Sequence, residues 1–130
     1  MHNRQKGNKG EDIACKYLQN KGFTIVERNY QKAWGELDII AEKDKYIHFF
    51  EVKSVSADLS ARDESRDSVG HRPEENVHAL KSRHIRRVVA TYLEETGKGL
   101  EAEFKFHVLC VFMDFRKRLS RVKWIRDIIL

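Results

Sequence analysis

Apolar and polar residues follow two different periods along this chain. Between Asn8 and Lys21 the apolar residues recur every three to four positions, which predicts an amphipathic helix that ends at Gly22. Other segments alternate or are continuously apolar, with many Ile, Val and Phe residues, and these predict strands. The predicted strands are Phe23 to Tyr30, Gly35 to Lys43, Tyr46 to Lys53 and Phe104 to Met113.

The second half of the chain predicts one more helix and a final short element. Pro73 suits a first helical turn, and an apolar stripe continues from there to about Glu95. Val122 to Ile129 fits either a strand or a short helix. The order α-β-β-β-α-β, with this last element added, predicts a mixed α/β sheet flanked by helices. We expect one domain over residues 1–130, with a flexible polar loop at about 54–72.

Composition narrows the class of protein. Of 130 residues, 41% are hydrophobic and 35% are charged, and no apolar stretch of about 18 residues predicts a membrane span. The N-terminus is polar and does not predict a secretory signal. Cys15 and Cys110 lack the spacing of a zinc site and lie in apolar patterns. These features predict a cytoplasmic protein without a membrane partner.

Positive charge is gathered into two segments. Lys and Arg outnumber Asp and Glu by 25 to 20, and neither Asn76 to Leu93 nor Arg116 to Arg126 contains an acidic residue. Such clusters are suited to phosphate groups, although a solvated basic surface has the same composition. The first cluster contains the predicted nucleic-acid-binding residues Lys81, Arg83, Arg86 and Arg87.

The second and third strands predict a hairpin that places acidic residues opposite each other. If its turn is centred on Asp44-Lys45, Asp38 lies opposite Glu51, and Glu36 lies opposite Lys53. Residues two apart share a face of a strand, so these four side chains would project from one side. The other side would carry the apolar residues Leu37, Ile39, Phe50 and Val52.

Two opposed carboxylates destabilise a sheet unless something neutralises them. Asp38 and Glu51 would both reach a hard divalent cation such as Mg²⁺ (or Mn²⁺), and Lys53 would lie beside it. This donor set suits phosphodiester hydrolysis, in which the metal activates water and the lysine stabilises charge. The alternative is an exposed ladder of ion pairs with no catalytic role.

Several motifs follow one another in a fixed order along the chain. They are Gly10-Glu11, Gly22-Phe23, Arg28-Asn29-Tyr30, Gly35 to Ala41, Phe50-Glu51-Val52-Lys53, and Pro73 to Val77 with Lys81. In this order they resemble the YraN family, which is similar to the PD-(D/E)XK nuclease superfamily, and the resemblance covers the chain from about Gly7 to Tyr92. It implies a restriction-endonuclease-like fold, as in archaeal Holliday-junction resolvases.

The resemblance implies that Glu11 approaches the metal with Asp38 and Glu51, although an acid in a first helical turn is also favourable by itself. Lys81 falls in the middle of an apolar stripe, which suggests contact with the acidic site or a substrate phosphate, with snorkelling as the alternative. Ser54-Val55 and the long acidic segment before Pro73 depart from the resembled pattern. They leave the substrate contacts open.

The expected function is therefore that of a Mg²⁺-dependent endonuclease acting on branched or structured DNA, in repair or recombination. A non-catalytic nucleic-acid-binding module and a protein-interaction subunit are the alternatives. The histidines do not have the spacing of metal ligands. Trp34 is either a base-stacking residue or a loop anchor. The apolar residues at the end of the chain, Trp124-Ile125 and Ile128-Ile129-Leu130, suggest the edge of a possible homodimer.

Overall fold

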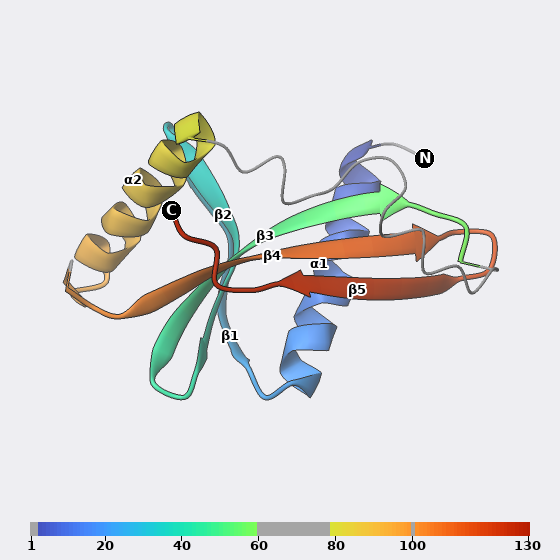
Figure 1. Cartoon of the computed structure of the whole chain (residues 1–130), viewed down its shortest axis with the longest axis horizontal. Helices are drawn as coiled ribbons and strands as arrows, with labels where there is room; N and C mark the ends of the chain where they lie inside the picture. The colour runs from blue at the N-terminus through green and yellow to red at the C-terminus, as the bar shows by residue number, and fades with distance from the viewer. Residues whose placement is uncertain (1–2, 60–78, 100) are drawn as a thin grey trace.

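The computed structural model describes residues 3–59, 79–99 and 101–130 of the chain. The mixed α/β class and the predicted order of elements are confirmed, and the last element is a strand (Figure 1). The elements are α1 (Asn3–Asn20), β1 (Thr24–Lys32), β2 (Gly35–Lys43), β3 (Tyr46–Ser56), α2 (Ala79–Glu95), β4 (Phe104–Asp114) and β5 (Leu119–Ile125).

Several element boundaries depart from the prediction, and the last strand is Leu119–Ile125 where Val122 to Ile129 was expected. Helix α1 begins five residues earlier than expected, at Asn3. Strand β3 continues to Ser56, so the first residues of the predicted 54–72 loop are strand. The rest of that loop, from residue 60, and the predicted helix start at Pro73 lie outside the described residues.

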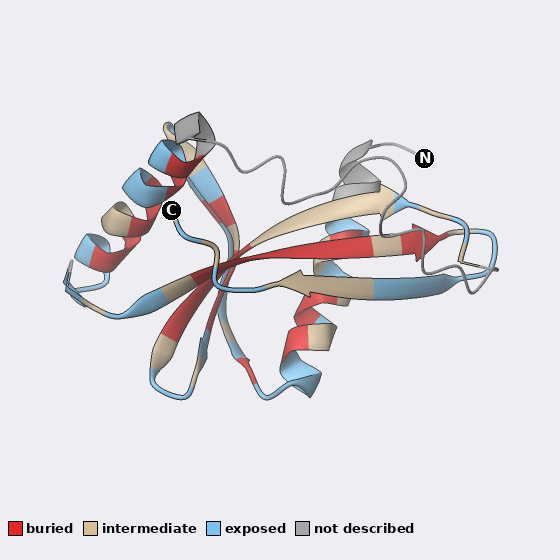
Figure 2. Cartoon of the chain, viewed as in Figure 1, coloured by how far each residue is buried: buried red, intermediate tan, exposed pale blue. Residues whose placement is uncertain are grey.

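One five-stranded sheet has the order β1-β2-β3-β4-β5. Strands β3 and β4 pair in parallel, and all other neighbours are antiparallel. Strand β4 is buried over most of its length because it has a neighbour on each side and a core on each face (Figure 2). The sheet is consistent with the restriction-endonuclease-like architecture expected from the sequence.

The two helices cover opposite faces of the sheet, each over its own apolar cluster. On the α1 face, Leu18 packs with Ile39 and Phe50. On the α2 face, Val88 packs with Ile40 and Phe49. The alternation of strand side chains separates these sets, since Ile39 and Ile40, like Phe49 and Phe50, are neighbours in sequence.

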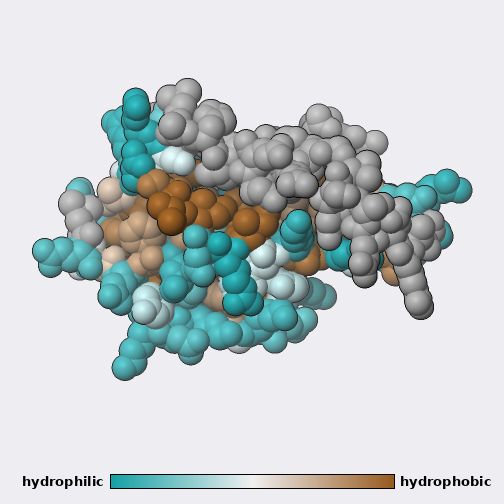
Figure 3. Space-filling view, in the orientation of Figure 1, coloured by the Kyte–Doolittle hydropathy of each residue, from teal (hydrophilic) through white to brown (hydrophobic). Residues whose placement is uncertain are grey.

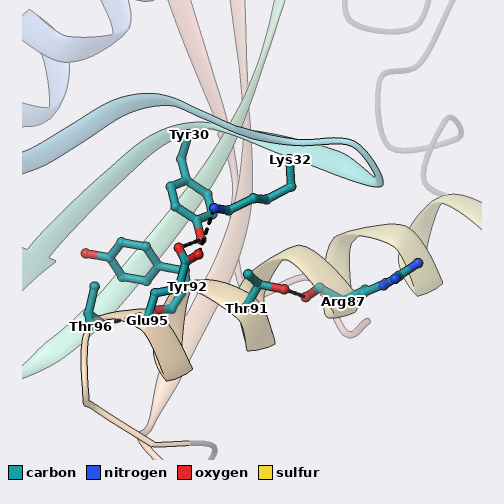
Figure 4. A network of polar contacts seen from close by, with 7 residues as sticks. All are labelled: Tyr30, Lys32, Arg87, Thr91, Tyr92, Glu95 and Thr96. Carbon is teal, nitrogen blue, oxygen red and sulfur yellow. Dashed lines mark hydrogen bonds and ion pairs between the residues drawn. The ribbon is translucent and has the colours of Figure 1, made fainter.

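A polar network fixes the end of α2 against β1 (Figure 4). The Tyr30 hydroxyl donates to Glu95, and Lys32 Nζ lies 2.7 Å from the other Glu95 oxygen. Lys32 and Tyr30 lower the pKa of Glu95 through these hydrogen bonds, while burial raises the pKa of Tyr30. Helix α2 is thereby held over the part of the sheet that contains β2.

A buried histidine pair joins β3, β4 and the C-terminal segment. His107 Nδ1 accepts a hydrogen bond from the Asp127 amide at 3.0 Å, so its proton resides on Nε2. His107 Nε2 lies 2.9 Å from His48 Nδ1 and donates to it. Burial, followed by the charge of His48, lowers the pKa of His107 to about 4, and burial also lowers that of His48.

We predict that this pair makes folding less favourable as the pH falls. Because the pKa of His107 is below its ordinary value of 6.5, the unfolded chain binds more protons between about pH 6.5 and pH 4. The free energy of unfolding, measured with urea, should fall over this range more in the wild type than in His107→Gln. His84→Gln, at an exposed histidine, is the control and should keep the wild-type slope. Parallel slopes in wild type and His107→Gln would contradict the prediction.

Most of the apolar C-terminal residues pack against the core of the same chain. Trp124 packs against the α1 cluster, and Ile125, Ile128 and Leu130 pack against the α2 cluster. Ile129 is 93% exposed, and Figure 3 shows hydrophobic surface gathered beside α2. The homodimer remains a prediction.

Two composition-based expectations can be compared with the described residues. No helix there is long and apolar enough to cross a membrane. Cys15 and Cys110 are buried thiols, as expected from their apolar surroundings.

Candidate metal and phosphate site

The β2–β3 hairpin has the predicted register, and its turn explains why. Asp44 and Lys45 both have positive φ, of 54° and 73°, as in the two-residue turns that match the twist of a hairpin. Pairing runs from Lys43↔Tyr46 to Ile39↔Phe50. It therefore stops one pair before the predicted opposition of Asp38 and Glu51.

The Asp38 side chain accounts for the end of the ladder. Its Oδ2 accepts a hydrogen bond of 2.7 Å from the backbone amide of Val52. A carboxylate thus takes the place of a backbone carbonyl, and the two strands separate at this point. The predicted pairing of Glu36 with Lys53 is consequently wrong, because the β2–β3 register ends at Ile39↔Phe50. On its other edge, β2 places Glu36 opposite Gln31 of β1, whose side chain donates a hydrogen bond to Glu36.

The separation also breaks the alternation of side chains in β2. Ile39, Phe50 and Val52 share one face as predicted and pack toward α1, but Leu37 packs in the α2 cluster. The prediction that Leu37 shares a face with Ile39 is therefore wrong. Across from Asp38, Asn29 of β1 has a φ of 54°, so the irregularity affects both neighbouring strands.

Asp38 is the electrostatic centre of the site. Burial raises its pKa to about 7, the Val52 amide lowers it, and the carboxylates of Glu11, Glu36 and Glu51 raise it further. Each of these acids was singled out from the sequence, and the structure brings all four into electrostatic range. A nearby cation would relieve this repulsion and return Asp38 to its ionised form.

Glu11 approaches Asp38 from helix α1, on the other side of the sheet from Glu51. Its side chain is only 13% exposed, and one of its oxygens lies 3.5 Å from Arg28 of β1. Arg28 also forms a shorter ion pair, of 2.9 Å, with Asp12. Glu11 is thus held by an arginine as well as placed near Asp38.

Glu51 and Lys53 project from β3 on the α2 face. Lys53 Nζ lies 3.4 Å from Glu51 Oε1, which confirms that the two share a face. Glu51 lines a cleft of about 310 Å³ between β2, β3 and α2, together with Glu36 and His84. The remaining lining residues are Gly35, Leu37, Phe50, Ile85, Val88 and Phe106.

The donor set fits a magnesium ion held by few protein ligands. Among the residues that the structure describes, no three His, Cys, Asp or Glu side chains are arranged to hold a metal ion. Mg²⁺ is commonly bound by one or two carboxylates, with water and substrate phosphates as its other ligands. Asp38 and Glu51 carry hard oxygen atoms of the kind that such a site would use, and burial together with the neighbouring carboxylates raises the pKa of Asp38.

The predicted phosphate-binding residues of α2 divide into two kinds. Arg83 and Arg86 are exposed on the helix. Arg87 is exposed as well, but its guanidinium lies over the Trp34 ring, 4.4 Å from the ring centre, so Trp34 anchors the β1–β2 turn to α2. Lys81 belongs to the first turn of α2, and its side chain lies outside the described residues.

Comparison with known proteins identifies relatives over most of the chain. A model of the family described as "Uncharacterised protein family UPF0102" matches residues 10–112. The chain belongs to the UPF0102 family. This agrees with the YraN-type motifs found in the sequence, which begin at the same glycine.

Individual UPF0102 relatives come from several bacteria. The UPF0102 protein of Campylobacter lari is 38% identical over 120 residues, covering 91% of this chain and 93% of the relative. That of Syntrophomonas wolfei is 34% identical over 112 residues, covering 86% and 88%. A Helicobacter hepaticus relative is 54% identical over 54 residues, which is 42% of this chain and 49% of the relative.

Two residues of this UPF0102 site were not singled out by sequence reasoning. His84 was expected to have an ordinary role, yet it lines the cleft with Glu51. His84 lies three residues after Lys81, and residues with this spacing share one face of a helix, so the sequence could have placed His84 beside Lys81. Arg28 forms ion pairs with Glu11 and Asp12. It belongs to the Arg28-Asn29-Tyr30 motif, but only the three-dimensional structure shows that it contacts α1.

Proposed function

We propose that this UPF0102 protein is a Mg²⁺-dependent endonuclease of the PD-(D/E)XK type, related to archaeal Holliday-junction resolvases. The observation that carries the proposal is the separation of β2 and β3 at Asp38, with Glu51 and Lys53 on the adjoining strand. A partly buried acid whose pKa is raised by burial and by neighbouring carboxylates, as for Asp38, is typical of sites built for a cation or for proton transfer.

Asp38 and Glu51 would hold the metal, which when bound supplies Lewis-acid activation of water and of the phosphoryl oxygen. The Val52 amide fixes the direction of the Asp38 carboxylate. Lys53, already beside Glu51, would place its ammonium against the phosphate and stabilise its developing negative charge. Glu11 and Glu36 would act on the site through their charge.

Nucleic acid, with DNA as the expected form, is the substrate that suits this chemistry and charge. The net charge of +5 and the exposed Arg83 and Arg86 support a polyanionic partner. A branched or flapped structure follows from the resemblance to resolvases. The DNA-repair or recombination role is part of the same proposal.

The test is cleavage of labelled single-stranded, duplex, flap and four-way-junction DNAs with Mg²⁺ or Mn²⁺. We expect the wild type to cut one class, and Asp38→Asn and Lys53→Ala each to lose at least a hundredfold in rate, as expected for removal of a group that stabilises the transition state. Asp44→Asn makes the same chemical change at the exposed turn of the same hairpin and should retain the wild-type rate.

The outcomes separate the alternatives. Salt-sensitive DNA binding without cleavage would favour a non-catalytic nucleic-acid-binding module. Equal cleavage by wild type and Asp38→Asn would mean that a contaminating nuclease is responsible. Neither metal binding nor DNA binding would leave the acidic residues as an ion-pair network in a protein-interaction subunit.

A further inference from the structure

Strand register extends the face that carries Lys53 across the sheet to β5. Lys53 pairs with Cys110 of β4, and Cys110 pairs with Lys123 of β5. Two residues further along β3, Val55 pairs with Phe112, which pairs with Arg121. Residues in register on neighbouring strands project from the same face, so Lys123 and Arg121 share the face of Glu51 and Lys53.

The two rows form a basic surface with an apolar centre. Arg121 is exposed, and Lys123, Phe112 and Val55 are partly exposed. Neighbouring strands are roughly 5 Å apart, so the backbones at Lys53 and Lys123 are separated by about 10 Å. Neither Arg121 nor Lys123 forms an ion pair with another described residue. This part of the face extends beyond α2, which packs on β2 (Figure 1).

The turn before β5 adds further positive charge in a fixed arrangement. Asp114 is 5% exposed, and its Oδ1 accepts hydrogen bonds of 3.1 Å from the backbone amides of Arg116 and Lys117. Its other oxygen accepts from the Leu59 amide at 3.0 Å. The only acid of this turn therefore faces inward, while the side chains of Arg116, Lys117 and Arg118 are exposed.

We propose that Arg121 and Lys123 of β5 are a phosphate-binding row that holds the nucleic-acid strand on one side of the reacting phosphate. This proposal rests on the proposed function, because it takes Lys53 as the residue beside the reacting phosphate. Binding by the row can nevertheless be measured separately from cleavage. The ligand chemistry is a phosphodiester backbone. The adjoining Phe112 offers an apolar surface to a sugar or an unstacked base, which favours a single-stranded segment at this place.

The experiment is fluorescence anisotropy with labelled single-stranded, flap and duplex oligonucleotides, in DNA and RNA forms, over a range of salt and without divalent metal. The variant is Arg121→Gln/Lys123→Gln. The control is Lys16→Gln/Lys45→Gln, which removes the same charge from two exposed lysines on α1 and at the β2–β3 turn. Thermal melting establishes that both variants fold as the wild type does.

We expect the β5 variant to reduce affinity at least tenfold at low salt and to flatten the plot of log affinity against log salt by about 1.4 to 1.8, for two lost phosphate contacts. The control should keep the wild-type slope. The proposal is overturned if the wild type binds no oligonucleotide, or if the β5 variant and the control variant bind oligonucleotides equally well. It is also overturned if the wild type binds vesicles containing phosphatidylserine but does not bind oligonucleotides.

Cleavage by the same variants keeps the two proposals distinguishable. If the β5 variant loses affinity and salt slope as expected but no protein cuts, the β5 row stands and the nuclease assignment fails. If the β5 variant cuts and binds as the wild type does, the nuclease assignment stands and the row fails.

Discussion

Asp38→Asn is expected to stabilise the metal-free protein above pH 7 and to abolish stabilisation by Mg²⁺ or Mn²⁺. The pKa of Asp38 is raised from 3.8 to about 7, so the folded state binds more protons than the unfolded state between these values. Stability is therefore lost as the pH rises through this range, and the cost is complete above pH 7. At about 1.4 kcal/mol per pKa unit, its upper bound is about 4 kcal/mol.

The substitution isolates charge because the Asn oxygen can still accept the hydrogen bond from Val52. The measurement is thermal or urea unfolding at pH 6 and pH 8, with EDTA and with each metal. Asp44→Asn is the matched control and should show neither effect. A destabilised Asp38→Asn protein at pH 8, or one that metal still stabilises, would show that Asp38 has a purely structural role.

Gly10→Ala should destabilise the protein and weaken metal binding, although alanine ordinarily favours a helix over glycine by about 1 kcal/mol. A Cβ at Gly10 would lie 1.9 Å from Ser54 Oγ and 3.0 Å from Ser54 Cβ. The Ser54 hydroxyl would have to turn away, and the contact with Ser54 Cβ, which rotation does not relieve, would press α1 and Glu11 away from β3. We expect a loss of about 1–3 kcal/mol, as for other overpacked contacts.

A second substitution tests the cause. Gly10→Ala/Ser54→Ala removes the closer of the two contacts and should recover part of the stability and of the metal response. Asn8→Ala, at an exposed position two residues earlier in α1, serves as the control and should leave both unchanged. A stabilised Gly10→Ala protein would mean that α1 does not depend on this close contact.

The sequence was informative wherever structure depends on near neighbours. The turn residues Asp44 and Lys45 set the hairpin register, and this register brought Asp38 near Glu51 without any knowledge of the remaining chain. Strand periodicity placed Lys53 on the face of Glu51 for the same reason. Both inferences need only a period of two and a turn of two residues.

What was missed depends on contacts between distant segments or on a side chain replacing backbone. The end of the ladder at Asp38 arises because a carboxylate competes with a carbonyl for the Val52 amide, and no pattern of apolar residues records that competition. The placement of Lys123 on the face of Lys53 follows from register through β4, which joins β3 in parallel and cannot be read locally. The histidine pair likewise joins residues 59 positions apart.

The parallel pairing of β3 with β4 has a consequence for how the chain reaches this arrangement. The two strands adjoin, yet 47 residues, 57–103, connect them. Glu11, Asp38, Glu51 and Lys53 all precede this connection, in a segment whose strands pair with their immediate successors. The greatest entropic cost of loop closure therefore falls on joining the acidic half of the molecule to β4 and β5, and not on assembling the acidic half itself.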